Sequence, residues 1–340
     1  MSSIVGGREP QILDFLRAVG WAQAERRMLA GDASFRKYYR LSDGARRAVL
    51  MDAPPPKEDV RPFLTVARHL AKLGLSVPRV FEADIDRGFL LLEDLGDDTY
   101  TRKLADGADE FELYGLAVDL LIDLHRRFAV DGAADIPRFD AARALREVNL
   151  LLDWYWPAVM GRPADEATRK SYAAAWNEAL PAIWSAPESI ALFDFHVDNL
   201  MLLAGRSGVA ACGLLDFQDA VIAPVAFDLV SLLEDVRRDV PPDLVAAMKE
   251  RYFAAFPDLD RAGFARAYAA IGAQRNTRIV GVFTRLMVRD GKPRYLSMIP
   301  RVWRLLEGDF AHPALRPVRE WFDAYLPRER RIIPDLKTSS

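Results

Sequence analysis

The apolar pattern of this chain changes at Gly96, and the patterns on either side require different secondary structure. Before Gly96, apolar and polar residues alternate in short runs bounded by turn residues, which is typical of half-buried strands. The predicted elements are a hairpin over residues 35–52 with its turn at Ser42–Gly44, a helix over 60–73, and strands at 80–81 and 89–92. We therefore expect a small antiparallel sheet with one main helix.

After Gly96, apolar residues recur at helical spacing over long stretches. Helices are predicted near residues 113–124, 141–155, 165–184, 225–238, 243–255 and 261–289. Residues 191–217 break this pattern, because two short apolar runs, 200–203 and 213–215, flank Gly205 and Gly208. We expect a small hairpin embedded in a helical region.

The length of 340 residues suits about two domains at roughly 150 residues each. A boundary at the change of pattern gives an N-terminal lobe over residues 1–96 and a C-terminal lobe over 97–340. The predicted class is α+β, with a small antiparallel N-lobe and a mainly helical C-lobe.

Composition excludes several classes of protein. The 46 basic and 49 acidic residues give a net charge of −3, so no basic excess is present to bind nucleic acid. One cysteine and four histidines exclude a disulfide scaffold and a multi-histidine metal cluster. No signal-peptide pattern and no apolar run of about 18 residues is found. We expect a cytoplasmic protein without a membrane or an obligate protein partner.

The segment from Ile190 to Asp239 is strongly acidic. It holds eight acidic and three basic residues, a local charge of −5. Carboxylates gathered at the ends of apolar strands repel one another and are costly to desolvate, and a bound cation relieves both costs. This segment is therefore the first place to search for a metal-dependent site.

Magnesium-dependent phosphoryl transfer needs this kind of arrangement. It requires a carboxylate near the attacking hydroxyl and hard oxygen ligands on the metal ion. Asp194 and Asn199 have the D-x-x-x-x-N spacing of a kinase catalytic loop, and Asp216 follows the next apolar strand, where a kinase places its metal-binding aspartate. We predict Asp194 as the catalytic residue and Asn199 and Asp216 as the metal ligands.

With these motifs in order, the chain resembles the aminoglycoside-phosphotransferase-type kinases of the protein-kinase-like superfamily. Leu91–Leu95 matches the hinge of that family, and Asp216–Ala220, followed by Phe227–Leu229, matches its second metal motif and a buried aspartate. The resemblance spans residues 30 to 300 approximately. It implies a two-lobed protein-kinase-like fold that binds ATP and Mg²⁺, with adenine against Glu93, Asp94 and Leu95.

A narrower resemblance is to the bacterial N-acetylmuramate/N-acetylglucosamine kinases. It is carried by the segments Gly31–Arg40, Asp52–Pro55, Asp216–Ala220 and Arg289–Lys292, with Tyr295. The resemblance implies phosphorylation of the anomeric hydroxyl of an amino sugar by ATP. It further implies a role in peptidoglycan recycling and cell-wall biogenesis, and a link to fosfomycin resistance.

Three positions depart from the kinase pattern. Leu192 replaces the histidine that normally precedes the catalytic aspartate by two residues. The strand Val49–Asp52 lacks the phosphate-binding lysine, and the helix from Arg61 to Lys72 lacks its glutamate partner. The last two losses agree with each other, since either residue alone would be an unpaired charge.

Another cation is therefore expected to face the phosphates. Arg36, Lys37 and Arg40 are candidates, with Arg36 and Arg40 on one strand face and Lys37 on the other, and the choice between the faces stays open. The loop Gly31–Ser34 has one glycine, so it is not a G-x-G-x-x-G loop, and Ser34 is a candidate to hold a phosphate oxygen.

The sugar acceptor has less specific candidates. They are Trp154 as a stacking platform, His196 and Asp219 near the catalytic loop, and Arg275 and Arg289 as partners of a sugar carboxylate. Each has an alternative role: the tryptophan as core, the histidine as a neutral packed side chain, and Asp219 and the arginines as solvated charges. Asp228 is expected to brace the catalytic loop from inside the helical lobe.

Two other functions remain open from the sequence. The same fold can accept an aminoglycoside or choline, and an acidic pocket suits such cations. A nucleotide-binding pseudokinase regulator would explain the missing lysine, glutamate and histidine, although Asp194, Asn199 and Asp216 argue against it.

Overall fold

A computed structural model describes residues 7–29 and 35–336 of the chain, which form two compact units. The sheet unit comprises Met1–Ala108 and Asp198–Asp219, and the helical unit comprises Asp109–Val197 and Ala220–Ser340. These units differ from the lobes predicted over 1–96 and 97–340, because residues 97–108 and 198–219 pack with the sheet. The predicted α+β class is confirmed.

The sheet unit alternates short strands with three helices among its described residues. Its elements are α1 (Glu9–Ala18), β1 (Glu25–Met28), β2 (Lys37–Asp43), β3 (Arg46–Asp52), α2 (Arg61–Lys72), β4 (Val80–Asp84), β5 (Phe89–Leu92), α3 (Tyr100–Ala105), β7 (Leu200–Leu202), a 3₁₀ turn η5 (Gly208–Ala211) and β8 (Cys212–Leu214). The predicted hairpin, helix and strand pair are confirmed as β2–β3, α2 and β4–β5. The helices α1 and α3 and the strand β1 are not among the predicted elements.

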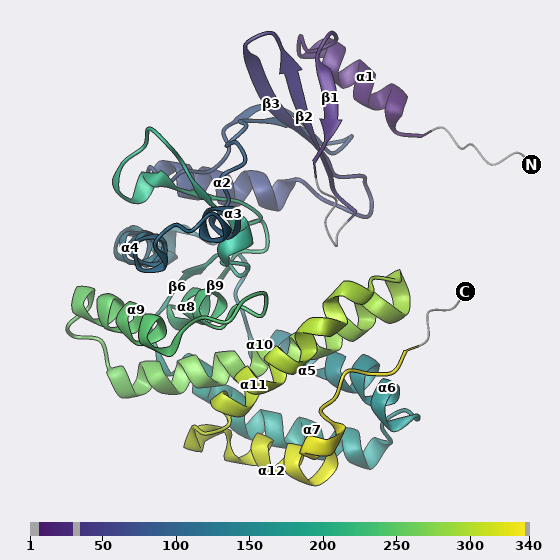
Figure 1. Cartoon of the computed structure of the whole chain (residues 1–340), viewed down its shortest axis with the longest axis vertical. Coiled ribbons are helices and arrows are strands. Elements are labelled where there is room, and N and C mark those ends of the chain that lie inside the picture. The colour runs from purple at the N-terminus through teal and green to yellow at the C-terminus, as the bar shows by residue number, and fades with distance from the viewer. Residues whose placement is uncertain (1–6, 30–34, 337–340) are drawn as a thin grey trace, which may run out of the picture. The chain divides into compact units, whose positions relative to one another are not determined.

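Five antiparallel strands form the main sheet in the order β1-β2-β3-β5-β4 (Figure 1). The hairpin β2–β3 pairs Lys37 with Asp52 and Asp43 with Arg46, and Gly44 in its turn has a φ of 58°. An L-residue with a side chain adopts that conformation only at a cost, so glycine fits this turn.

Helix α1 covers one face of this sheet, so the expectation of one main helix is incomplete (Figure 1). Ile12, Phe15 and Leu16 of α1 pack in one apolar cluster with side chains from β2, β3 and β5. The ring of Phe15 stacks on that of Phe89 with centroids 5.5 Å apart. This burial holds α1 in place, since apolar area removed from water stabilises by about 25 cal/mol per Å².

The predicted hairpin in the acidic segment is confirmed as β7 and β8, but the expectation that it is embedded in the helical region is wrong, because residues 198–219 belong to the sheet unit. It joins the sheet unit through its backbone: Leu214 N–H donates to Ser76 O at 2.8 Å, and Leu202 N–H donates to Asp98 O at 2.8 Å. The Ser76 hydroxyl also donates to Ala210 O at 2.6 Å. These bonds tie the hairpin, which Asn199 precedes and Asp216 follows, to the rest of the sheet unit.

The helical unit consists almost entirely of helices. They are α4 (Glu110–Arg127), α5 (Ala141–Leu150), α6 (Trp156–Met160), α7 (Glu166–Ala179), α8 (Ala226–Leu233), α9 (Pro242–Ala255), α10 (Arg261–Asp290), α11 (Ile299–Asp309) and α12 (Arg316–Tyr325). Shorter turns are η1 (Val130–Gly132), the π turn η2 (Leu151–Tyr155), η3 (Leu180–Ser185), η4 (Val197–Asn199, which runs into the sheet unit), η6 (Pro293–Met298), η7 (Pro313–Leu315) and η8 (Arg328–Arg330).

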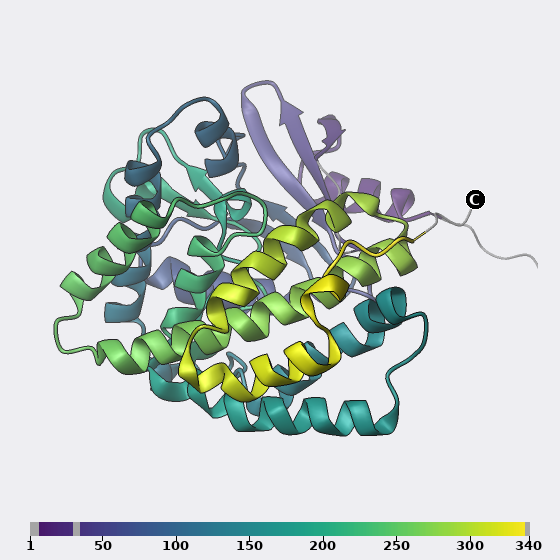
Figure 2. The same ribbon diagram turned by 60° about the horizontal axis from the view of Figure 1, so that its bottom comes forward.

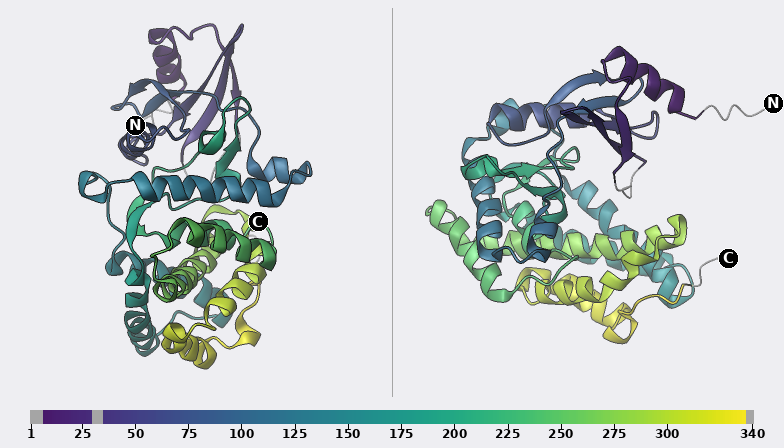
Figure 3. Two further views of the ribbon diagram at one scale, coloured as in Figure 1. Left: turned by 90° about the vertical axis from the view of Figure 1, so that its left-hand side faces the viewer. Right: turned by 45° about the horizontal axis from the view of Figure 1, so that its top comes forward.

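The 30-residue helix α10 forms the core of the helical unit. Most of its residues are buried, and α11, α5 and η2 pack along it (Figure 2). Helices α4 and α9 lie side by side in the same unit (Figure 3). Within residues 7–29 and 35–336, no helix is both long and apolar enough to cross a lipid bilayer.

Candidate active site

The loop that carries Asp194 begins at the end of a two-stranded sheet inside the helical unit. Strand β6 (Glu188–Ala191) pairs with β9 (Val221–Pro224), and the loop follows β6 directly. Buried Asp228 on α8 accepts the Leu192 N–H at 2.6 Å and the Phe193 N–H at 3.0 Å. The expectation that Asp228 braces this loop is confirmed.

Burial raises the pKa of Asp228 to about 7, although the two backbone donors oppose that shift. The carboxyl therefore changes charge near neutral pH. Leu192, in the position where kinases carry a histidine, is buried among apolar side chains. In this chain the brace on the loop thus comes from Asp228, through the backbone and not through a histidine ring.

Phe193, the residue before Asp194, is held in the left-handed region with a φ of 75°. Its carbonyl accepts the Ser231 hydroxyl at 3.2 Å, and its ring stacks on Phe227 with centroids 5.1 Å apart. The guanidinium groups of Arg143 and Arg278 lie 4.5 and 4.7 Å from the same ring. These contacts hold a strained residue in place, and they thereby set the direction in which Asp194 leaves the loop.

Asp194 interacts electrostatically with Arg275 and Asp228, and buried His196 lies two residues along the same loop. His196 is 4 % exposed, and burial, with the positive charges of Arg237 and Arg275, lowers its pKa well below the usual value. The ring is therefore neutral at pH 7. Arg275 is 3 % exposed, and its burial, together with the positive charge of Arg237, lowers the pKa of its guanidinium. The negative charges of Asp235 and Asp194 oppose this shift.

The predicted metal ligands lie in the sheet unit at neighbouring strand ends. Leu200 pairs with Leu214 across β7 and β8, and Leu215 N–H donates to Asn199 O at 2.9 Å. Asn199 and Asp216 are therefore brought together at one end of this hairpin. Both side chains are partly exposed.

Asp216 is the second non-glycine residue with positive φ among the described residues, at 54°. The Gln218 amide donates to its carboxylate at 2.8 Å and to Asp219 at 3.3 Å. The Arg36 guanidinium lies 3.4 Å from the Asp216 carboxylate and 3.7 Å from that of Glu58. Asp219 is exposed. The structure thus places Arg36 at the predicted metal-binding carboxylate.

Of the three cations considered for the phosphates, Arg40 is committed elsewhere. Its guanidinium is 6 % exposed and forms ion pairs with Asp94 at 2.8 Å and Asp97 at 2.7 Å. Lys37 is exposed at the start of β2. Arg36 therefore remains the best-placed candidate, and Ser34, with the loop Gly31–Ser34, lies outside the described residues.

The acidic side chains of the predicted hinge take part in ion pairs within the sheet unit. Glu93 accepts from the guanidinium of Arg206 at 2.7 Å and from the Arg79 N–H at 3.2 Å. Asp94 binds Arg40, and its carboxylate also accepts the Gly96 N–H at 3.0 Å. Leu95 is partly exposed. The predicted adenine contacts at these residues stay a prediction.

The remaining sugar-binding candidates are Trp154 and Arg289, which lie on different elements of the helical unit. Trp154 is partly exposed in η2, next to Tyr155, whose buried hydroxyl donates to Arg330 O and Ile332 O. Arg289 is exposed and pairs with Asp290 at 2.7 Å. Its role, like that of Trp154, stays a prediction.

The residues at the hairpin end suit a magnesium ion that a nucleotide shares. An amide and a carboxylate oxygen are hard ligands, and Mg²⁺ in phosphoryl-transfer sites takes one or two protein ligands together with phosphate oxygens. The described ranges contain no cluster of three or more histidine, cysteine or carboxylate groups able to hold a metal ion. This sparse donor set fits an ion that arrives with the nucleotide.

Several residues of the site were not foreseen from the sequence. They are Phe193, Ser231, Arg143, Gln218 and Glu58. Only the polar cluster Asp216–Asp219 carried a local signal, because Gln218 lies between the two aspartates. The others act through packing across the fold, which no short motif encodes.

Comparison with known proteins identifies relatives of the whole chain. The model of the phosphotransferase enzyme family matches residues 25–265. A protein of Caulobacter vibrioides, named N-acetylmuramate/N-acetylglucosamine kinase, is 38% identical, and the match covers 95% of this chain and 98% of the relative. A Pseudomonas aeruginosa protein with the same name is also 38% identical, with coverage of 85% and 86%.

Solved structures share the fold at low sequence identity. The choline kinase LicA from Streptococcus pneumoniae has a TM-score of 0.64 at 12% identity, covering 89% of this chain and 99% of that one. The ADP-bound aminoglycoside phosphotransferase APH(2'')-Ib has a TM-score of 0.60 at 16% identity, covering 87% and 96%. These likenesses confirm the protein-kinase-like fold. Because the family model spans more than half of the sequence, the chain belongs to the phosphotransferase enzyme family.

Proposed function

We propose that this protein is a sugar kinase that transfers the γ-phosphoryl group of ATP to the anomeric hydroxyl of N-acetylmuramate, N-acetylglucosamine or both. The product is the sugar 1-phosphate, and the reaction belongs to peptidoglycan recycling. The observation that carries the proposal is the agreement of four curated relatives, which are 34 to 38% identical over at least 80% of this chain and bear this kinase name.

The nucleotide part of the proposal has further support. A family of phosphotransferases needs a phosphoryl donor, and a solved structure of the same fold holds ADP. We assign Asn199 and Asp216 to Mg²⁺, Arg36 to the phosphates, and the segment Glu93–Leu95 to adenine. The metal ion would neutralise charge on the transferring phosphoryl group.

Asp194 is assigned to the sugar hydroxyl. Its carboxylate accepts a hydrogen bond from that hydroxyl and orients it for in-line attack on the phosphorus. An anomeric hydroxyl is more acidic than an ordinary sugar alcohol, so the carboxylate orients the group more than it deprotonates it. The hydrogen bonds of Asp228 and Ser231 to the backbone of Phe193 contribute by fixing the direction of the Asp194 carboxylate before the substrate binds.

The test is an ADP-release assay with ATP and Mg²⁺ in which N-acetylmuramate, N-acetylglucosamine, kanamycin and choline are offered separately. We expect turnover with the amino sugars and a phosphorus NMR signal coupled to an anomeric proton. Asp194→Asn should lower kcat by about 10²-fold or more, the cost of a misoriented hydroxyl, and leave ATP binding intact.

Asp239→Asn is the matched control, because Asp239 is an exposed carboxylate of the same unit, held by Arg301 and Arg304. It should turn over like the unchanged chain. Turnover with kanamycin or choline alone would overturn the amino-sugar assignment. ATP binding without turnover of any acceptor would instead favour a pseudokinase.

A further inference from the structure

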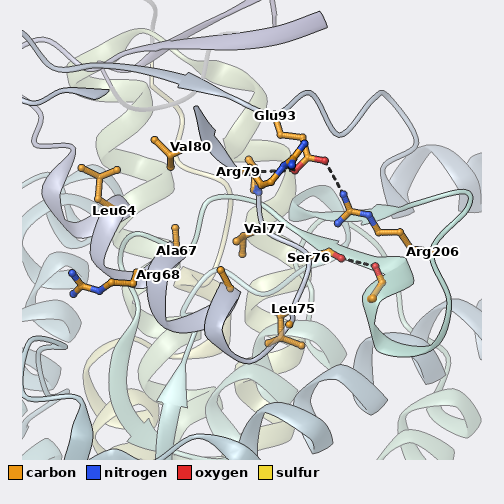
Figure 4. Close-up of a pocket in the computed structure, with 14 residues that line it drawn as sticks. Leu64, Ala67, Arg68, Leu75, Ser76, Val77, Arg79, Val80, Glu93 and Arg206 are labelled. Atoms are coloured by element: carbon orange, nitrogen blue, oxygen red, sulfur yellow. Dashed lines mark hydrogen bonds and ion pairs between the residues drawn. The ribbon is translucent and has the colours of Figure 1, made fainter. Parts of the chain in front are cut away.

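The sheet unit contains a cavity of about 810 Å³ that shares only Glu93 with the residues assigned above to ATP and Mg²⁺ (Figure 4). It lies between helix α2, the segment Gly74–Val80 that follows it, Glu93, and the turn between β7 and β8. Its volume falls within the 300 to 1,000 Å³ of small-molecule sites. None of Arg36, Asn199 and Asp216, assigned above to nucleotide and metal, lines it.

Apolar side chains form much of the wall of this cavity. They are Leu64, Ala67 and Ala71 of α2, with Leu75, Val77 and Val80. A ligand that fills such a space needs an apolar body, because apolar surface removed from water is the main source of its affinity.

The charged side chains of the cavity are unbalanced. Three arginines, Arg68, Arg79 and Arg206, line it, and Glu93 is the one carboxylate among the lining residues. Arg79 and Arg206 share the Glu93 carboxylate, so these three side chains carry one net positive charge. Guanidinium groups bind phosphate and carboxylate through paired donors, so this excess selects an anion.

Glu93 already occupies the place that such an anion would take. Its carboxylate lies 2.7 Å from the Arg206 guanidinium and 3.5 Å from that of Arg79 (Figure 4). Arg79 is 75% and Arg206 35% exposed, so both groups are reachable from solvent. Two guanidinium groups on one carboxylate leave donors for a second anionic group.

We propose that this cavity is a binding site for an organic phosphate. Its phosphate group binds Arg79 and Arg206 and competes with Glu93, and its apolar body lies along Leu64, Ala67 and Val77. Asp194, assigned to the sugar acceptor, does not line this cavity, and the proposal does not depend on the sugar kinase function. Glu93 also belongs to the segment assigned to adenine, so the ligand would bind next to the nucleotide-binding segment.

The test measures binding of 1-naphthyl phosphate to the full chain by its fluorescence, with saturating ATP and Mg²⁺ present to fill the nucleotide site. Inorganic phosphate and neutral 1-naphthol are the matched partial ligands. We expect one bound 1-naphthyl phosphate per chain and at least tenfold weaker binding of either partial ligand. Arg79→Met and Arg206→Met keep the apolar stem and should each weaken binding about tenfold.

Arg61→Met is the control, since Arg61 lies on α2, which lines the cavity, but is itself outside the cavity and 72% exposed. Its affinity should equal that of the unchanged chain. Glu93→Gln should bind at least threefold more tightly, because the competing carboxylate is gone. Arg79→Met and Arg206→Met variants that fold and bind as tightly as the Arg61→Met control would overturn the proposal, as would a Glu93→Gln variant with no gain.

Discussion

Phe193 and Asp216 are the two non-glycine residues with positive φ in the described part of the chain, and they are the neighbour of the predicted catalytic residue and a predicted metal ligand. Such backbone costs of order 1–3 kcal/mol and persists only where the surroundings impose it. For Phe193 those surroundings are identifiable: Asp228 on the amide, Ser231 on the carbonyl, and Phe227 against the ring. Sequence patterns favour glycine or asparagine in this conformation, so neither residue could be predicted from its type.

The first prediction concerns Asp228. An asparagine there offers one acceptor oxygen to two backbone donors, so Asp228→Asn leaves either Leu192 or Phe193 without its partner. The free energy of unfolding should fall by about 1–3 kcal/mol, the cost of one buried unsatisfied donor. Amide hydrogen exchange at these two residues should speed up, and kcat should fall more than the KM for ATP rises.

Ser231→Ala is the milder companion, because it removes a single neutral hydrogen bond to Phe193. It should cost about 1 kcal/mol. Unchanged exchange at Leu192 and Phe193 in the Asp228→Asn variant would contradict the bracing role of this carboxylate.

The second prediction concerns Arg36. If this side chain replaces the missing lysine, Arg36→Met should raise the KM for ATP about tenfold and change the KM for the sugar little. Arg47→Met on the exposed end of β3 is the control for loss of one positive charge. Equal KM values for ATP in the two variants would show that another cation faces the phosphates.

At the scale of elements, α10 packs closely against the backbone of α5 and η2 because it carries a glycine, Gly281, at the point of contact. A Cβ on Gly281 would overlap the backbone of Leu150 and Leu151, where α5 passes into the π turn η2. Gly308 on α11 is exposed, and a Cβ there would meet nothing within 4 Å. These two glycines therefore give a matched pair of substitutions.

The third prediction is that the same substitution at these glycines has opposite effects. Gly281→Ala should lower the free energy of unfolding by about 2 kcal/mol through overpacking. Gly308→Ala should raise it by about 0.5 kcal/mol, because alanine restricts the unfolded chain. Urea unfolding measures both, and a Gly281→Ala variant as stable as the unchanged chain would contradict the close approach of α10 to η2.

The same crossing shows which elements the sequence predicts and which it does not. The helix expected over 261–289 is α10 almost to the residue, since its pattern is long and its cap Gly291 is a strong local signal. The helix expected over 141–155 instead changes to a π turn at Leu151, next to Gly281 of α10. Contacts between distant segments decide such changes, so a local pattern cannot contain them.

Elements without a periodic pattern were missed for a related reason. Strand β1 reads Glu-Arg-Arg-Met and is largely exposed, and only its pairing with β2 makes it a strand. In the candidate site, the spacing of Asp194, Asn199 and Asp216 was readable because chemistry fixes it. The contacts around Phe193 and Arg36 come from tertiary packing, so the sequence does not predict them.

At the scale of the molecule, buried acids are concentrated in the helical unit. Glu234 is half-buried and Asp309 is buried, and the Asn276 amide donates to each at 3.0 Å. Burial raises the pKa of both carboxyls, and for Asp309 the nearby Glu234 adds to the rise. The Lys249 ammonium opposes both shifts, and its own pKa is lowered by burial. The pair therefore retains protons at a pH where free carboxyls are ionised.

This arrangement predicts how stability depends on pH. A carboxyl whose pKa is higher in the folded state stabilises the fold fully below its unfolded pKa, near 4, and loses that contribution as pH rises through the folded value. The free energy of unfolding of the helical unit should thus decline as pH rises above the ordinary pKa of a carboxyl group. Glu234→Gln and Asp309→Asn should each flatten this decline in urea titrations, because an amide does not ionise.

Asp239→Asn is the control for this titration. Arg301, by hydrogen bonding and charge, and Arg304 lower the pKa of Asp239 to about 2, so this group stays ionised from pH 5 to 8 and its loss should leave the slope unchanged. If the free energy of unfolding falls with pH equally in all three variants, the decline comes from other groups. Asp228, with its pKa of about 7, would then be the next carboxyl to replace. If the free energy of unfolding of the unchanged chain instead rises with pH, the Glu234–Asp309 pair does not retain protons in the folded state.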